Sequence, residues 1–180
     1  MKRIHHAKKY LVALTLALPA AGCSGAGMDE DIEARIGSDV YAIDDYAANV
    51  VQAGSVTRIV LSSFRTESCS IADSATSFSA QINIADVADV PLGTAIDIED
   101  PMAPVQVTVD AGTADCGFSG GAERKVHGTV TFTSLSASSA QGSVDLRIDG
   151  AVSDCGVSSP TSIEYRWSSF AAPSSHDSCE

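Results

Sequence analysis

Basic residues are scarce in this sequence, and their scarcity excludes one class of partner. The 180 residues include 11 Lys or Arg and 23 Asp or Glu. All of the acidic residues but only seven of the basic ones follow residue 22, so residues 23–180 carry a formal net charge of −16. Such a surface repels phosphate backbones and anionic lipid head groups. We therefore expect no nucleic-acid partner and attribute the acidity to solubility outside the cell, with cation binding as the alternative.

Motifs for cofactor binding are also missing. No two cysteines are spaced C-x-x-C, which excludes the common zinc and thioredoxin-like arrangements. No glycine-rich loop leads into an expected helix, so nucleotide binding has no support. The sequence thus predicts a protein that is not an enzyme and that needs no metal or other cofactor.

The apolar run at residues 11–21 is too short to span a bilayer core, which needs about 20 residues. The ten residues before it carry four basic residues and no acid, and the run ends in small residues. A basic head, a short apolar stretch and a small-residue end are typical of a secretory signal peptide. We expect residues 1–22 to be that signal; a buried core helix is the alternative, which Pro19 disfavours.

The end of this segment, Ala20-Ala21-Gly22-Cys23, resembles the lipobox of bacterial lipoproteins. In that family the cysteine carries diacylglycerol, the signal is cut before it, and the new amino group is acylated. The resemblance implies that Cys23 is the first mature residue and the attachment point to the membrane. The family usually has Leu where this chain has Ala20, and ordinary secretion with cleavage near Ala21 is the alternative. Ser24, in place of the Asp that favours the inner membrane, implies the outer membrane.

Beyond residue 38 the apolar residues recur with a period of two, which is typical of antiparallel strands with one buried face. We expect strands at residues 56–62, 77–85, 94–98, 105–110, 126–134, 143–149 and 162–170. Breaks rich in Gly, Pro, Ser and Asp separate these strands. The pattern predicts an all-β domain of about seven strands, either an antiparallel β-sandwich or a partly open β-barrel.

Three segments follow from these observations. Residues 1–22 are the signal peptide, residues 23–38 a lipidated cysteine with a flexible acidic tether, and residues 39–180 a single β-rich domain. A short helix over Asp29–Ile36 is the alternative for part of the tether.

The four cysteines after Cys23 predict two disulfides, because an even number in an exported protein favours pairing. They are Cys69, Cys116, Cys155 and Cys179. If the strands at 126–134 and 143–149 form a hairpin, Cys155 faces about residue 122, next to the loop that holds Cys116. We therefore favour the pairs Cys116–Cys155 and Cys69–Cys179.

The segment Gly128–Cys155 resembles the final part of small uncharacterised Gram-negative lipoproteins. In those proteins a Gly-Thr-Val-Thr strand, a serine-rich turn and a Gly-Ser-x-Asp-Leu strand precede a late cysteine, as they do here. The resemblance supports the hairpin and an envelope location, and it implies no activity.

Several polar side chains are candidates for chemistry. His127 would serve a small hydrolase only beside a serine and an acid, and an exposed strand histidine is the plainer interpretation. Asp97, Glu99 and Asp100 form a dense acidic cluster that would act as paired carboxylates or bind calcium, although the EF-hand spacing is absent. We favour a solvated loop for this cluster. The same interpretation applies to Asp44, Asp45 and His176.

Trp167 shares an expected strand face with Ile163 and Tyr165, which favours a place in the core. If it were exposed, it would instead form a stacking platform for sugars, together with Tyr41 and Tyr46. The sequence therefore predicts a lipid-anchored envelope protein with a non-catalytic binding or structural domain, whose partner is an envelope protein or a glycan. A carbohydrate-binding or adhesin-like module and a small envelope hydrolase are the alternatives.

Overall fold

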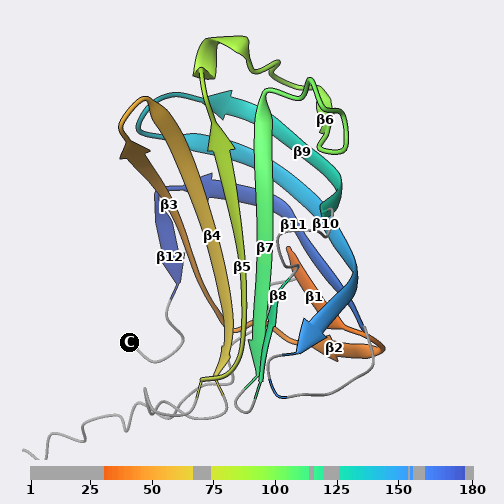
Figure 1. The fold of residues 1–180 in the computed structure, drawn as a ribbon. Helices are drawn as coiled ribbons and strands as arrows, with labels where there is room; N and C mark the ends of the chain where they lie inside the picture. Colours follow the sequence, from red (N-terminus) through yellow and green to blue (C-terminus); the bar gives the residue numbers. More distant parts are fainter. Residues whose placement is uncertain are drawn as a thin grey trace, which may run out of the picture.

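Apolar and polar residues alternate along most of the chain, and a computed structural model has twelve strands in the residues that it describes (Figure 1). These residues are 31–66, 74–113, 116–119, 126–153, 155 and 161–176. The strands of the described residues form two antiparallel sheets that are not closed into a barrel, so the all-β prediction is confirmed.

Six strands form the first sheet, sheet A, in the spatial order β6-β9-β10-β11-β1-β2. Their bounds are Ala95–Asp97 (β6), Val126–Leu135 (β9), Ala140–Ser153 (β10), Thr161–Ala172 (β11), Ile32–Ile36 (β1) and Asp39–Tyr41 (β2). All of the neighbouring pairs are antiparallel. Both edges of the sheet are three-residue strands, which leaves little backbone open to further pairing.

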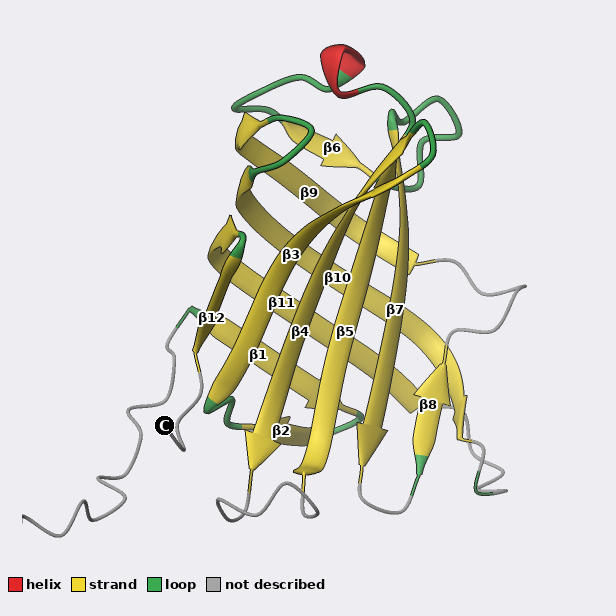
Figure 2. Cartoon of the chain, turned by 90° about the vertical axis from the view of Figure 1, so that its left-hand side faces the viewer, coloured by secondary structure: helices red, strands yellow, loops and turns green. Residues whose placement is uncertain are grey.

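The other six strands form sheet B, in the order β12-β3-β4-β5-β7-β8. Their bounds are Ser174–His176 (β12), Asp45–Ala53 (β3), Val56–Thr66 (β4), Ser74–Ile84 (β5), Val105–Thr113 (β7) and Gly117–Ser119 (β8). The short β8 also pairs with the end of β10, which joins the two sheets along one side. Figure 2 shows the long strands of sheet B crossing in front of those of sheet A.

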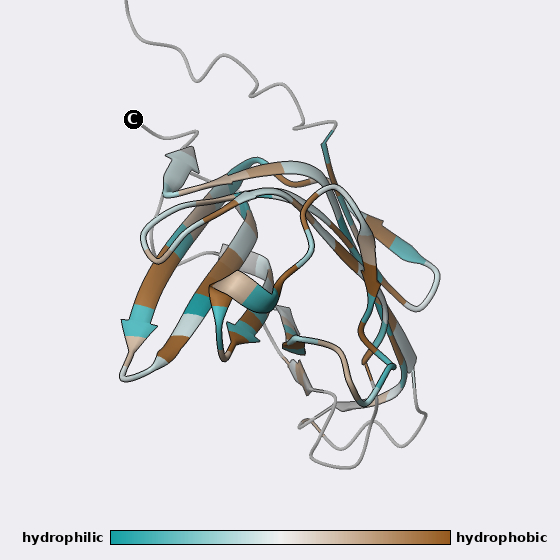
Figure 3. Cartoon of the chain, turned by 90° about the horizontal axis from the view of Figure 1, so that it is seen from above, coloured by the Kyte–Doolittle hydropathy of each residue, from teal (hydrophilic) through white to brown (hydrophobic). Residues whose placement is uncertain are grey.

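The inward faces of the two sheets pack together and form the core. On β5 the alternate residues Phe78, Ala80, Ile82 and Ile84 are each at most 1 % exposed. On β11 the same alternation buries Ile163, Tyr165 and Trp167. Seen from above, apolar and polar bands alternate along the strands (Figure 3). Each large apolar side chain buried in this way contributes about 1.5–3 kcal/mol.

Polar and aromatic contacts cross this core from sheet to sheet. The hydroxyls of Ser63 on β4 and Tyr165 on β11 are 2.6 Å apart, and both residues are fully buried. Phe78 stacks on Tyr165 with ring centroids 6.2 Å apart, and Tyr46 meets Trp167 edge-on at 5.1 Å. Burial raises the pKa of the Tyr165 hydroxyl, and the hydrogen bond with Ser63 offsets this increase only in part.

The hairpin of β9 and β10 forms as expected, but its register differs from the prediction. Val130 faces Val144 and His127 faces Arg147, and a register shift lies between Gln141 and Gly142. Gly128 permits this close pairing, because its φ is +121° and an added Cβ would lie 2.0 Å from the Asp145 carbonyl oxygen. Beyond the hairpin β10 continues along β8 instead of facing residue 122.

This continuation brings Cys116 and Cys155 together. They form a disulfide with their Cα atoms 5.5 Å apart, the pair that the sequence favours. Cys116 stands directly before β8, and Cys155 follows the end of β10, so the bond closes the side where the sheets join. The other favoured pair, Cys69–Cys179, lies outside the described residues.

The expected tether at residues 23–38 is wrong in its second half. Residues Ile32–Ile36 form β1, which lies between β11 and β2 and pairs with five residues of β11. Ile32, Ala34 and Ile36 are buried against the core, so neither a coil nor a helix forms there. The folded unit therefore includes residues before the expected boundary at 39.

The expected number of strands is also wrong, since about seven were predicted and the described residues alone form twelve. The expected strands all exist, several with longer bounds. The additional ones are β1, β2, β3, β8 and β12. Four of these have five residues or fewer, which is too short for a period of two to stand out.

Candidate functional site

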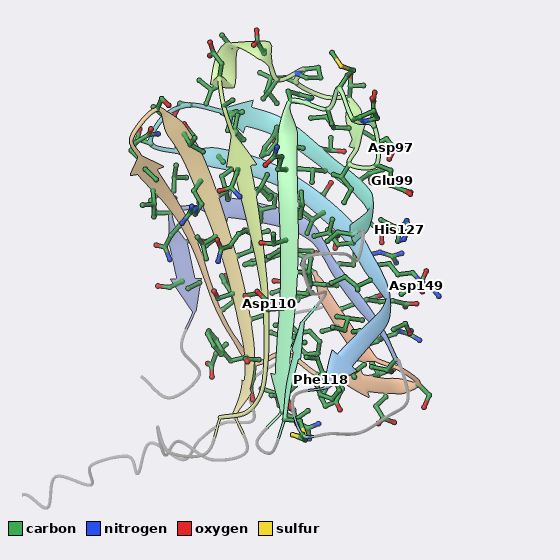
Figure 4. The ribbon with its side chains drawn as sticks, in the orientation of Figure 1. Asp97, Glu99, Asp110, Phe118, His127 and Asp149 are labelled. Carbon is green, nitrogen blue, oxygen red and sulfur yellow. A yellow bond between two sulfur atoms is a disulfide. The ribbon has the colours of Figure 1, made fainter. Side chains whose placement is uncertain are left out.

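Two of the candidate side chains meet at the β9 edge of sheet A. The connection from β5 to β7 passes along β9, where β6 pairs with it and the Ile98 amide donates to the Gly128 carbonyl. This path places Glu99 beside His127, with Nδ1 of the histidine 2.8 Å from Oε1 of the glutamate. Both side chains are more than one-third exposed and lie on the outside of the molecule (Figure 4).

The neighbouring carboxylates do not converge with this pair. Asp97 Oδ1 accepts a hydrogen bond from the Glu99 amide, and Asp100 Oδ1 accepts one from the Met102 amide, each at 2.9 Å. Such contacts are the usual way in which Asp shapes a turn. Within the described residues, no three His, Cys, Asp or Glu side chains gather closely enough to hold a metal ion. Asp97 and Asp100 thus shape the loop through hydrogen bonds from backbone amides, in line with the solvated loop that the sequence favours.

One motif match was missed in the sequence predictions. Residues 117–121 read Gly-Phe-Ser-Gly-Gly, the G-x-S-x-G pattern of hydrolase nucleophiles, which requires a turn from a strand into a helix. Here Ser119 is a strand residue of β8, paired with Asp110 on one side and Val152 on the other. His127 faces Arg147, five residues away along β10, which corresponds to about 17 Å. The serine and the histidine therefore do not meet.

Of the aromatic residues considered for sugar stacking, Trp167 lies in the core, and Tyr41 and Tyr46 are partly buried against it. Trp167 is 2 % exposed and contacts Tyr46 and Phe170 by its edges. Tyr41 packs against Phe78, and burial together with the nearby Asp39 raises the pKa of its hydroxyl. A platform built on Trp167 is therefore wrong, because no sugar could reach its ring.

The remaining polar candidates lie at one end of sheet B. Asp45 is buried rather than solvated, at 7 % exposure, and the amide of Asp44 donates to the Phe64 carbonyl at 3.1 Å. His176 pairs with Tyr46 through the backbone of β12. These residues belong to the pairing of β3 with its neighbours.

The outer face of sheet A carries charges of alternating sign, and we call it the charged face. Its members are Glu33, Arg35, Asp145, Arg147, Asp149, Glu164 and Arg166. The strand register sets them side by side: Asp145 faces Arg166, and Arg166 faces Glu33. Arg166 Nη2 lies 2.8 Å from Asp145 Oδ2, and Arg147 Nε lies 2.8 Å from Asp149 Oδ1.

This pairing leaves the charged face satisfied within the molecule. Neighbouring carboxylates raise the pKa of Arg147 and Arg166, first through the hydrogen bonds that these arginines donate to Asp149 and Asp145. Arg35 in turn lies 3.9 Å from Glu164. The face has a hollow of about 220 Å³, and each arginine that lines it has a carboxylate neighbour.

The outer face of sheet B has a different composition, and we call it the amide face. Its members on β4, β5 and β7 are Arg58, Val60, Ser62, Phe64, Ser77, Ser79, Gln81, Asn83, Gln106, Thr108 and Asp110. Each alternates with a buried or more deeply packed residue of the same strand. Only Arg58 and Asp110 among these members are charged. Arg58 Nε donates to the side-chain oxygen of Asn83 at 2.9 Å rather than to a carboxylate.

Comparison with known proteins adds no relative to this description. No protein-family model, curated protein or solved structure matches the chain. Within the described part of the chain, no helix is long and apolar enough to cross a membrane. The described residues define an all-β protein of two antiparallel sheets with one charged and one largely uncharged outer face.

Proposed function

We propose that this chain is a lipid-anchored cell-envelope protein whose β-sandwich domain binds a partner without catalysis. The observation that carries the proposal is the Cys116–Cys155 disulfide, because structural disulfides persist in exported proteins and are rare in the cytosol. It agrees with the signal-like residues 1–22 and the lipobox at Ala20–Cys23. Ser24 after the cysteine favours the outer membrane as the location.

The short distance between the anchor and the domain supports a role close to the membrane. Ile32, the first residue of β1, follows Cys23 by nine residues. Such a linker reaches about 30 Å at full extension. The domain would therefore stand within about one domain diameter of the lipid surface.

The non-catalytic part of the proposal rests on where the candidate catalytic groups lie. His127 has an acid neighbour in Glu99, but the pair is exposed and stands about 17 Å along β10 from the one serine in a nucleophile-like motif. A hydrolase needs nucleophile and base within hydrogen-bond reach of each other. The hydrolase alternative has no supporting contact in the described residues.

A metabolic labelling experiment tests the anchor. Cells that express the full chain are fed a clickable palmitate analogue, and the labelled protein is followed in membrane and soluble fractions. We expect Cys23→Ser to lose the label and leave the membrane fraction, while Cys116→Ser retains the label. Label on Cys23→Ser, or an unlabelled wild-type protein with a mature end near Ala21, would overturn the proposal.

We also propose Cys69–Cys179 as a second disulfide, since the pairing of Cys116 with Cys155 leaves these two cysteines. Peptide mapping of the non-reduced protein tests it. A peptide pair joined through Cys69 and Cys179 is the expected product. Free thiols at either position, or bonds to Cys116 or Cys155, would contradict it.

A further inference from the structure

We propose that the amide face binds a neutral, hydroxyl-rich polysaccharide chain laid along β4 and β5. This inference rests on the proposed binding role of the domain and names the class of its partner. It uses a different surface from the Trp167 platform, which is buried in the core.

The chemistry of the amide face suits sugar hydroxyls. Its members stand in rows across three strands: Arg58, Asn83 and Gln106 form one row, and Val60, Gln81 and Thr108 form the next. Amide and hydroxyl side chains both donate and accept hydrogen bonds, as sugar hydroxyls do. A flat array of such groups can therefore satisfy a glycan in many registers along the strands.

The charge of the face selects a neutral partner. Residues 23–180 carry a net charge of −16, and the charged face uses its arginines in ion pairs. On the amide face Arg58 and Asp110 offset each other, and Asp45 of β3 adds one buried acid opposite Phe64, so the face carries little net charge. The negative charge of the rest of the molecule repels an anionic polymer and does not repel a neutral one.

Phe64 supplies an aromatic group at one end of the face. It alternates with the fully buried Ser63 and therefore lies on the outer side of β4. Its neighbours toward β7 are Ser77 on β5 and then Gly112, both small, and its neighbour on β3 is the buried Asp45. The small neighbours leave room on the β5 side of the ring for a sugar to stack, and apolar ring faces of sugars favour aromatic surfaces.

The dimensions also fit an extended chain. From Arg58 to Phe64, β4 runs six residues, which corresponds to about 20 Å. Adjacent strands lie about 4.8 Å apart, a spacing close to the size of one sugar ring. The face is thus long enough for several sugar units, with Phe64 at one end and Arg58 near the other.

Affinity electrophoresis tests this inference with the full chain extracted in detergent. Native gels contain dextran, galactomannan, xyloglucan or mixed-linkage β-glucan, and a gel with anionic polygalacturonate serves as comparison. We expect at least one neutral polysaccharide to retard the protein. Phe64→Ala should weaken the retardation at least about fivefold, and Gln81→Glu should also weaken it, because the new charge is desolvated at the contact.

The controls separate binding from folding. Arg166→Ala, on the charged face, should bind as wild type does, and the fluorescence of the buried Trp167 reports whether each variant is folded. Retardation by none of the neutral polymers, or only by polygalacturonate, overturns the inference. Unchanged binding of both amide-face variants overturns it as well. The lipid label on Cys23 is read separately, so a failure here leaves the anchor proposal standing, and the reverse holds too.

Discussion

The charged face and the amide face follow the same alternation along their strands, but the outward side chains of the first are mostly charged and those of the second mostly uncharged. On sheet A, cross-strand neighbours such as Asp145 and Arg166 have opposite charges and form ion pairs. On sheet B, the neighbours Val60, Gln81 and Thr108 are uncharged. Alternation decides which side chains face outward, because it is required by the core, but it leaves the type of outward residue free.

The two faces therefore differ in whether their polar side chains already have charged partners within the molecule. Each guanidinium on the charged face has a carboxylate within the molecule, so a ligand there must first displace an existing partner. A ligand on the amide face meets uncharged amides and hydroxyls, of which the Asn83 amide already accepts a hydrogen bond from Arg58. Exposed ion pairs also contribute little stability, so the charged face serves mainly solubility and strand register.

The join between the two sheets should give the largest effect when it is broken. The Cys116–Cys155 bond spans 39 residues, and the chain-entropy model assigns such a loop about 4 kcal/mol. We expect the double variant Cys116→Ser, Cys155→Ser to lose about that free energy of unfolding. Urea unfolding followed by Trp167 fluorescence measures it. Equal midpoints for the variant and wild type would show that the β8–β10 pairing alone holds the sheets together.

A substitution at Gly128 should weaken the pairing of β9 with β10, the strand that carries Asp145 and Arg147 of the charged face. The added methyl group would lie 2.0 Å from the Asp145 carbonyl oxygen, at a φ of +121°, so β9 must separate from β10. We expect Gly128→Ala to cost about 3 kcal/mol in urea unfolding.

Gly54→Ala is the matched control, because its φ is +67° and no atom lies within 4 Å of the added Cβ. We expect it to cost about 1 kcal/mol. Similar losses for the two variants would mean that backbone strain, and not the close approach of β9 and β10, determines the cost.

The hydrogen bond between Ser63 and Tyr165 tests how much a buried polar contact between the two sheets contributes to the free energy of unfolding. Tyr165→Phe leaves the buried Ser63 hydroxyl without this partner, and we expect a loss of about 1–2 kcal/mol at pH 8. Ser63→Ala with Tyr165→Phe should restore part of that loss. A Tyr165→Phe variant as stable as wild type would show that this contact contributes nothing.

The same tyrosine gives a pH dependence. Burial raises the pKa of Tyr165 above its ordinary value of 10.0, so above that pH the unfolded state releases a proton that the folded state keeps. Its contribution to stability is therefore full below pH 10.0 and is lost as the pH rises further. We expect the wild type to lose stability more steeply than Tyr165→Phe between pH 9 and 11, and parallel curves would contradict this.

The smallest effect belongs to the charged face itself. Arg166→Ala removes contacts to Asp145 and Glu33, and the expected loss is below about 1 kcal/mol because the side chain is half exposed. The loss should shrink further in 1 M NaCl, where screening is nearly complete. A larger loss that persists in salt would assign the face a structural role beyond its ion pairs.

Sequence reasoning succeeded where a strand is long and one of its faces is buried. The segments around Phe78–Ile84, Val144–Ile148 and Ile163–Trp167 alternate over several residues, and all are strands with the expected faces inward. It failed for β3, because the run Tyr46–Val51 places small and apolar residues side by side without a period of two. It failed for β1 because three alternating apolar residues in an acidic segment resemble a tether.

The site was harder to predict than the fold, because both faces depend on register. The ion pairs require Arg147 to stand beside Glu164 and Asp145 beside Arg166, which the register of β10 with β11 sets and the sequence pattern alone does not. The contact of His127 with Glu99 depends on a long connection that returns to the edge of β9. The amide face was visible in the sequence only as the polar half of each strand, without the order of strands that assembles it.

The position of β1 has a mechanical consequence. If Cys23 holds the lipid, any pull on a polymer bound to sheet B must reach the membrane through the chain before Ile32. That force first loads the five residue pairs between β1 and β11, next to the side chain of Trp167, which faces Ile32. The strand β1, which in the sequence resembles part of a tether, would thus resist the separation of the domain from its lipid anchor under force.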